Sequence, residues 1–342
     1  MVTALVYSEK YLEHNPGLEH PERPERLKAI VDGLKQAKLW ASPNVRVVEP
    51  KPARREDIEL AHDADYVSLV EKLSAAEKPI DEDTPVHKNT YELALLAAGG
   101  AIEAGRMVIS GEAKNAFALV RPPGHHASRA RGGGFCYFNN IAVMIECLKR
   151  DFGLQRAFIL DFDAHCGNGT ENIFYNDPNV FYMSIHQNPL TLYPGTGFVH
   201  EIGSGEGEGY TINVPMQPRS GDAEYAAVMQ EIFIPLCEQF KPELFAVSAG
   251  FDAHIDDPLT DLQLTTNAYG WLAGFVVEQA KRLCNGRTVF VLEGGYDLRA
   301  LSEGTTNIVK ALIEEKFYQP VEVKHSKVID EIRHVLLKKW EL

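Results

Sequence analysis

The sequence predicts an α/β fold built around a mostly parallel, doubly wound sheet. Short apolar runs recur along the 342 residues, and stretches with apolar residues at helical spacing lie between them. Most of the apolar runs end in a corner rich in Gly or Asp, which is typical of strands buried on both faces. No repeat, low-complexity linker or sharp change in composition divides the chain, so we expect a single domain over 1–342.

The expected elements alternate in order along the chain. Strands are expected at 3–7, 116–120, 158–160, 180–185, 244–248 and 288–292. Helices are expected around 27–34 and 93–97, and at 141–148, 226–236 and 269–283, because apolar residues there follow a helical period. The tail, 321–342, is expected to form an appended amphipathic helix.

The charge and the cysteine content exclude several classes of protein. The chain has 34 Lys and Arg against 48 Asp and Glu, a formal net charge of −14, which disfavours nucleic acid and favours cationic ligands. The 5 cysteines are odd in number and lie outside CxxC spacing, so we expect reduced thiols and a cytoplasmic location. We expect no signal peptide and no membrane span. The oligomeric state is left open, and a homo-oligomer is allowed.

Polar residues follow five of the expected strands. In parallel α/β sheets, ligands bind beyond the carboxyl ends of the strands. Those ends supply His, Asp and Tyr side chains to one edge of the sheet, in the segments 121–126, 161–168, 186–197, 252–254 and 293–296. We therefore expect the functional site at this edge.

Asp163 and His165 have the spacing of a metal-binding pair. Residues i and i+2 at a strand end point the same way, and Asp252 from another strand end would complete a three-ligand site with a position open for water. A purely structural role in a turn is the alternative for the pair alone. Zinc and ferrous iron both suit these ligands. Asp161 lies one step deeper, where a His or a monovalent cation would satisfy a buried carboxylate.

His125 and His126 follow a rigid Pro-Pro-Gly segment and could move protons beside a metal-activated water. If Asp161 holds one ring and Asn168 the other, the two would titrate differently, because a carboxylate raises the pKa of an imidazole. Tyr296 follows two glycines and could donate to an oxyanion. Alternatively, the histidines are polar side chains on the protein surface, and the tyrosine only packs against its neighbours.

Six ordered motifs carry a family resemblance: RPPGHHA, GGFCYFNN, DFDAHCGNGT, YPGTG, SAGFDAHIDDPL and EGGYD. Together they resemble the histone deacetylase superfamily, which includes acetylpolyamine amidohydrolases and acetoin-utilisation proteins. The resemblance runs from about Tyr7 to about Ala311 and includes the segment HPERPERL that begins at His20. It implies an arginase-like three-layer fold with a central sheet of about eight strands. It also implies a zinc-dependent amidohydrolase that removes acyl groups from an amine.

The resemblance assigns roles to individual residues. The zinc ligands would be Asp163, His165 and Asp252. The acid–base pair would be His125 and His126, buttressed by Asp161 and Asn168, and Tyr296 would be the oxyanion donor. The Asn at 168 resembles the class II branch. Substrate would be bound by Gly134, Phe135, Tyr193, Leu259, Asp83 and Gly295.

Two further sites are implied by the resemblance. Arg26 would line an internal channel for the released acetate. A structural potassium ion would be held by Asp161, Asp163, His165, Ser184 and Ile185. Cys166 stands where the family usually has a second His, and Tyr193 replaces the usual Phe. Neither departure removes a catalytic group.

The sequence allows several hypotheses about the substrate and the activity. An acetyl-lysine in a protein or peptide is favoured, because Leu259 is apolar where a polyamine-selective relative places an acid. An acetylated polyamine is the nearest alternative and suits the acidic charge. A ureohydrolase would need a carboxylate at position 167, which is Gly. A non-enzymatic acyl-lysine binder is disfavoured because every catalytic group is present.

Overall fold

The computed structural model describes residues 2–17, 19–314 and 322–342. Its centre is an eight-stranded sheet with the strand order β2-β1-β3-β8-β7-β4-β5-β6, in which each neighbouring pair is parallel. The sheet confirms the expected fold class. The strands are β1 (Thr3–Val6), β2 (Val45–Val48), β3 (Asn115–Ala118), β4 (Ala157–Asp161), β5 (Val180–Gln187), β6 (Thr211–Met216), β7 (Leu244–Ala249) and β8 (Thr288–Leu292).

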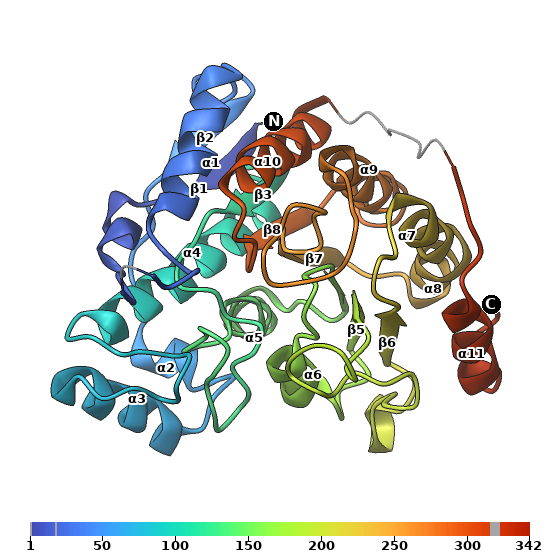
Figure 1. Cartoon of the computed structure of the whole chain (residues 1–342), viewed down its shortest axis with the longest axis horizontal. Coiled ribbons are helices and arrows are strands. Elements are labelled where there is room, and N and C mark those ends of the chain that lie inside the picture. The colour runs from blue at the N-terminus through green and yellow to red at the C-terminus, as the bar shows by residue number, and fades with distance from the viewer. Residues whose placement is uncertain (1, 18, 315–321) are drawn as a thin grey trace.

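Helices cover both faces of the sheet, which gives three layers (Figure 1). One face carries α2 (Arg55–Ile58), α3 (Ala64–Ala76), α4 (Thr90–Ile109), α5 (Asn140–Phe152) and α6 (Asn168–Phe174). The other carries α1 (Glu25–Gln36), α7 (Asp222–Val228), the π-helical turn η3 (Met229–Phe233), α8 (Ile234–Phe240), α9 (Thr266–Leu283) and α10 (Leu298–Glu314). Two short 3-10 helices, η1 (Glu9–Glu13) and η2 (Gly205–Gly207), lie in connections.

The expected strands and the observed ones differ by at most two residues at either end, but β2 and β6 were not expected. Both are edge strands. The segment VRVV of β2 has only 4 residues, which is too short to establish a hydrophobic period in the sequence. The sequence TINVPM of β6 contains Asn and Pro, which are depleted from strands. Edge position explains why Pro215 is tolerated there.

The C-terminal segment covers the outer edge of the sheet. Helix α11 (Lys327–Leu336) packs on β6, within the tail where a helix is expected, and residue 321 of that tail lies outside the described residues. Beyond the helix, the Trp340 indole N–H donates to the Gly209 carbonyl at 2.6 Å, and its ring lies edge-on to Phe181 and Tyr210. The unpaired edge of β6 is thereby protected.

The strand ends that carry the candidate functional residues lie close together in space. Asp161, the last residue of β4, is in register with Ser184 on β5 and with Ser248 on β7. Because all these strands run the same way, the loops that follow them meet at one edge. Among the described residues, no helix is long and apolar enough to cross a bilayer.

Candidate active site

Asp163, His165 and Asp252 converge just beyond β4 and β7. Each offers a ligand atom, and these atoms all lie within 4.8 Å of one another. His165 Nδ1 is 3.1 Å from Asp163 Oδ1 and 2.9 Å from Asp252 Oδ2. Two buried carboxylates and one imidazole are the donor set that a divalent ion such as zinc prefers. The residues therefore fit the metal that the sequence predicts.

Main-chain groups fix the two carboxylates in place. The Ala164 N–H donates to Asp252 Oδ1 at 2.7 Å, and the Gly294 N–H donates to Asp163 Oδ2 at 2.8 Å. Position 294 requires Gly, since a Cβ there would lie 2.5 Å from Asp252 Oδ2. The approach of the β8 loop to the carboxylates thus depends on the absence of a side chain.

Electrostatics in this group favour a bound cation. Burial, followed by the charge of Asp163, raises the pKa of Asp252 to about 6. Burial alone would lower the pKa of His165, but its hydrogen bonds to Asp163 and Asp252 raise it to about 10. Two like charges held together in a buried site repel one another, and a divalent cation relieves that repulsion.

The tandem histidines have different partners, and these are the expected ones, Asp161 and Asn168. His125 Nδ1 lies 3.0 Å from Asp161 Oδ2, while His126 Nδ1 lies 2.7 Å from Asn168 Oδ1. The hydroxyl of Tyr182 also donates to Asp161 Oδ2, at 3.2 Å. Asp161 therefore has a second anchor, on β5, that the sequence did not reveal.

The two imidazoles differ in charge as a result. Burial lowers the pKa of His125, but the carboxylates of Asp163 and Asp161 outweigh burial and raise this pKa well above its ordinary value. Burial lowers the pKa of His126 well below its ordinary value, and the positive charges of His125 and His165 lower it further. His126 is therefore the neutral member of the pair near pH 7.

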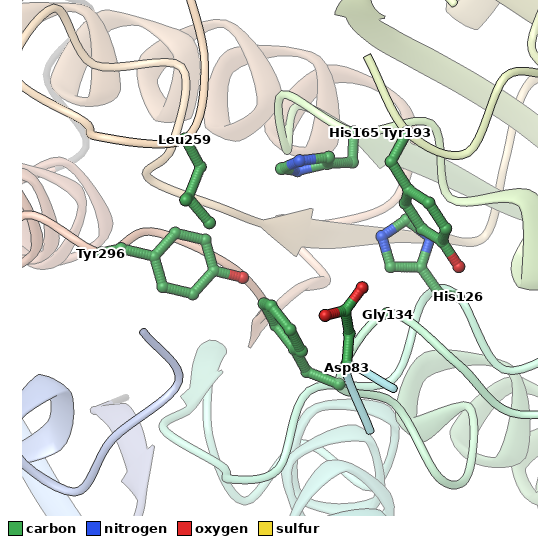
Figure 2. A pocket seen from close by; sticks show the side chains of 8 residues that line it. Asp83, His126, Gly134, His165, Tyr193, Leu259 and Tyr296 are labelled. Atoms are coloured by element: carbon green, nitrogen blue, oxygen red, sulfur yellow. The ribbon is translucent and has the colours of Figure 1, made fainter. Parts of the chain in front are cut away.

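A pocket with a volume of about 130 Å³ opens onto these groups (Figure 2). The Tyr296 hydroxyl points into the pocket, as Figure 2 shows. The pocket brings together most of the residues expected to bind substrate or act on it. Its lining is Asp83, His126, Gly134, Phe135, His165, Tyr193, Leu259 and Tyr296.

Gly295 and Arg26 lie behind this pocket and are not among its lining residues. Arg26 is fully buried, donates from Nε to the Gly295 carbonyl at 2.6 Å, and also reaches the Glu293 carbonyl. Its guanidinium is 5.1 Å from the centre of the Tyr296 ring. Arg26 therefore supports the loop that carries Tyr296, and its expected channel role stays a prediction.

The residues expected to bind potassium are placed together by the sheet. Asp161 and Ser184 are register partners, and Ile185 follows Ser184 on β5. The Ser184 hydroxyl contacts His186 Nδ1 at 2.7 Å. The potassium assignment stays a prediction.

Cys166 is buried, with Sγ 3.6 Å from Glu171 Oε2, and is not among the pocket-lining residues.

Two buried carboxylates support the site without any signal of their own in the sequence. Glu293 accepts the N–H groups of Gly124 at 2.8 Å and His125 at 3.1 Å, so it holds the main chain of the tandem histidines. Asp257 accepts the N–H of Tyr296 at 2.7 Å. Both lie inside motifs of the sequence, but these three N–H donors are 39 or more residues away from them in the chain.

Comparison with known proteins agrees with this geometry. The family described as histone deacetylase domain matches residues 20–312. A probable deacetylase of Archaeoglobus fulgidus is 42% identical over 100% of this chain and 99% of its own. Polyamine deacetylase HDAC10 of Homo sapiens is 38% identical over 92% of this chain and 48% of its own.

Structural comparison agrees as well. The crystal structure of the HDA15 HD domain superposes with a TM-score of 0.92 at 33% identity, covering 99% of this chain and 95% of that one. Histone deacetylase 14, chloroplastic, of Arabidopsis thaliana is 40% identical over 91% of this chain and 77% of its own. The chain therefore belongs to the histone deacetylase family of metal-dependent hydrolases.

Proposed function

We propose that this protein is a zinc-dependent deacetylase that removes the acetyl group from the ε-amine of lysine in proteins or peptides. One observation carries the proposal. An imidazole, His126, and a phenol, Tyr296, line the same pocket as His165 of the Asp163–His165–Asp252 group. A base, an oxyanion donor and a metal site facing one cavity are the requirements of metal-assisted amide hydrolysis.

Asp163, His165 and Asp252 would hold the ion, and zinc or ferrous iron suits them. When bound, a divalent ion supplies a Lewis acid that polarises an amide carbonyl and lowers the pKa of water. The protein contributes the geometry. Main-chain N–H groups hold both carboxylates in place.

His126 is the general base. Its Nδ1 faces the carbonyl oxygen of Asn168, so Nδ1 carries the proton and Nε2 keeps a free lone pair. The low pKa of His126 keeps that lone pair available near pH 7. His126 takes the proton of the attacking water at Nε2 and returns it to the leaving amine.

His125 serves the same reaction without lining the pocket. The carboxylates of Asp163 and Asp161 raise its pKa, so His125 carries the charge of the pair, and its ring centre lies 4.1 Å from that of His126. Its positive charge keeps His126 neutral in the resting enzyme and favours negative charge forming nearby. Across the pocket, the Tyr296 hydroxyl donates to the oxygen of the carbonyl as it becomes an oxyanion.

The residues that line the pocket also indicate which substrate it accepts. Phe135 and Tyr193 provide aromatic walls for an extended aliphatic chain, and Leu259 is an apolar group 38% exposed at the opening. Asp83 adds a carboxylate that can accept a backbone N–H of a peptide substrate. An apolar gate favours acyl-lysine over a polycation. An acetylated polyamine is the second candidate, favoured by the formal charge of −14 and by the likeness to polyamine deacetylase HDAC10.

The deciding experiment measures kcat/KM for an acetyl-lysine peptide and for an N-acetylated polyamine with the same enzyme. Each substrate is tested with zinc-loaded protein, with chelated protein, and with the Asp252→Ala variant as an inactive control. Metal-dependent turnover that favours the peptide is expected. A preference for the polyamine would move the function to amine metabolism, and no turnover of either substrate by zinc-loaded protein would overturn the proposal.

A further inference from the structure

Asp257 joins two loops that each contribute a residue to the pocket. It lies in the loop between β7 and α9 and is 6% exposed. Its Oδ1 accepts the N–H of Leu259 at 3.0 Å, and its Oδ2 accepts the N–H of Tyr296, from the loop after β8, at 2.7 Å. One carboxylate thus holds the main chain of the pocket gate and of the oxyanion donor.

The peptide unit that precedes Tyr296 is held at both of its polar ends. Its carbonyl oxygen, which belongs to Gly295, accepts from Arg26 Nε at 2.6 Å. Its N–H, which belongs to Tyr296, donates to Asp257. A guanidinium donor at the oxygen and a carboxyl acceptor at the N–H match the dipole of the peptide group. Gly295 has φ +109°, a conformation that L residues rarely adopt, so this loop needs external contacts to fix its path.

The side of the loop opposite Asp257 is fixed as well. The Tyr296 ring lies edge-on to Phe135 at 5.8 Å between ring centres, and the Arg26 guanidinium lies 5.1 Å from the Tyr296 ring centre. These contacts restrict the plane of the ring. The contact with Asp257 instead fixes the main-chain nitrogen of Tyr296, next to the Cα that bears the side chain, and so limits how far the hydroxyl reaches into the pocket.

We propose that Asp257 is a positioning residue for deacetylation, because its two oxygens fix the position of the Tyr296 hydroxyl relative to the Leu259 gate. The inference rests on the roles proposed above for Tyr296 and Leu259. Asp257 is not among the residues that line the pocket, so it acts through those two residues.

The requirement is for a carboxylate and not merely for a polar side chain. Both oxygens act as acceptors, and each has its own N–H partner. Asparagine has the same shape but only one acceptor, so its NH₂ group would face one of the two N–H donors. Asp257→Asn should therefore release one loop while leaving the packing volume unchanged.

A double-mutant cycle tests the proposal. The kcat/KM for the acetyl-lysine peptide is measured for the wild type, Asp257→Asn, Tyr296→Phe and the double variant. Asp257→Asn should lower kcat/KM about tenfold or more, mainly through kcat, since small misplacements of a reacting group are costly. In the Tyr296→Phe background the same change should cost less than about threefold, because the hydroxyl that Asp257 positions is gone.

Equal losses in the two backgrounds, or near-normal activity of Asp257→Asn, would overturn the proposal. Asp256→Asn is the matched control, because Asp256 is the adjacent carboxylate and its side chain is 57% exposed. Zinc content and Tm are measured for every variant, since a purely structural role would lower Tm and cost equal activity in both backgrounds.

If Asp257→Asn does not fold, Asp257→Glu is tested in the same cycle, because it keeps both acceptors and displaces them by one methylene group. Failure of the proposed function would be distinguishable, because zinc-loaded wild type would then turn over neither acetylated substrate. Failure of the Asp257 proposal leaves wild-type turnover intact.

Discussion

His125 and His126 are neighbours in the chain with ring centres 4.1 Å apart, yet a carboxylate holds the first ring and a carboxamide holds the second. Two imidazoles at this distance resist being charged together. The surroundings of each ring decide which one carries the charge. Asp163 and Asp161 raise the pKa of His125, whereas burial and the charge of His125 lower the pKa of His126, beside which Asn168 adds no negative charge.

Exchanging the second partner should shift the pH dependence of catalysis. Asn168→Asp places a carboxylate beside His126 Nδ1, which raises the pKa of that imidazole. His126 would then be protonated, and inactive as a base, up to a higher pH. The acidic limb of the kcat/KM profile should move to higher pH. Asn172→Asp, at an exposed position on the same helix α6, is the control and should leave the limb in place.

Removing the Tyr296 hydroxyl should lower the rate of hydrolysis and leave the zinc content unchanged. Loss of one oxyanion donor lowers the rate about a hundredfold or more. Tyr296→Phe should therefore lower kcat/KM by about this factor while zinc content, measured by atomic emission, stays that of the wild type. Tyr175→Phe, at the partly exposed end of α6, controls for loss of a hydroxyl elsewhere. Near-normal turnover of Tyr296→Phe would contradict the assigned role.

Metal removal should destabilise the fold as well as stop turnover. A ligand that binds only the folded state stabilises it by mass action. Chelation should lower Tm by several degrees, and added zinc should restore both Tm and activity. The Asp252→Asn variant loses a charged ligand, so zinc should raise its Tm much less. An equal zinc-induced shift in wild type and variant would place the ion elsewhere.

A buried histidine outside the pocket should make stability depend on pH. Burial lowers the pKa of His62 from 6.5 to about 4 in the folded protein. Its Nδ1 faces the Ser128 carbonyl at 2.8 Å, and its Nε2 accepts the Asn139 N–H at 2.8 Å, so the folded state holds the neutral ring. The unfolded chain binds a proton from about pH 6.5 downward, whereas the folded chain does so only near pH 4.

The contribution of His62 is therefore present above pH 6.5 and is lost progressively as the pH falls towards 4. His62→Gln removes this proton uptake. The gap in Tm between wild type and His62→Gln should narrow between pH 7 and pH 4.5 in thermal melts, as the wild type loses its advantage. A gap that stays constant over this range would show that His62 does not titrate on unfolding.

The part of the site that lies directly after strands could be predicted from the sequence. Asp163, His165 and Asp252 follow buried strands, and the parallel sheet brings those strand ends to one edge. The inner strands of the sheet were predictable because strands buried on both faces consist of continuous apolar residues. The edge strands β2 and β6 were not, since they owe their structure to one neighbouring strand and to covering segments such as α11.

The supporting carboxylates could not be predicted. Glu293 and Asp257 act by accepting main-chain N–H groups from distant segments, and no side-chain pattern marks an N–H donor in a sequence. The same holds for Tyr182, whose hydroxyl reaches Asp161 from a neighbouring strand. Residues that touch substrate carry recognisable chemistry, whereas residues that position them are visible only in three dimensions.

The place of β8 in the sheet has a consequence for biosynthesis. Among the described residues β8 is the last strand in sequence, but it lies between β3 and β7 in the middle of the sheet. Until it is synthesised, the chain can form only two partial sheets, each with an open edge. A nascent chain therefore carries Asp163, His165 and Asp252 before it can place Tyr296 beside them. Chains that end before this strand would have the metal ligands without the oxyanion donor, so hydrolysis awaits synthesis of the segment that carries β8 and Tyr296.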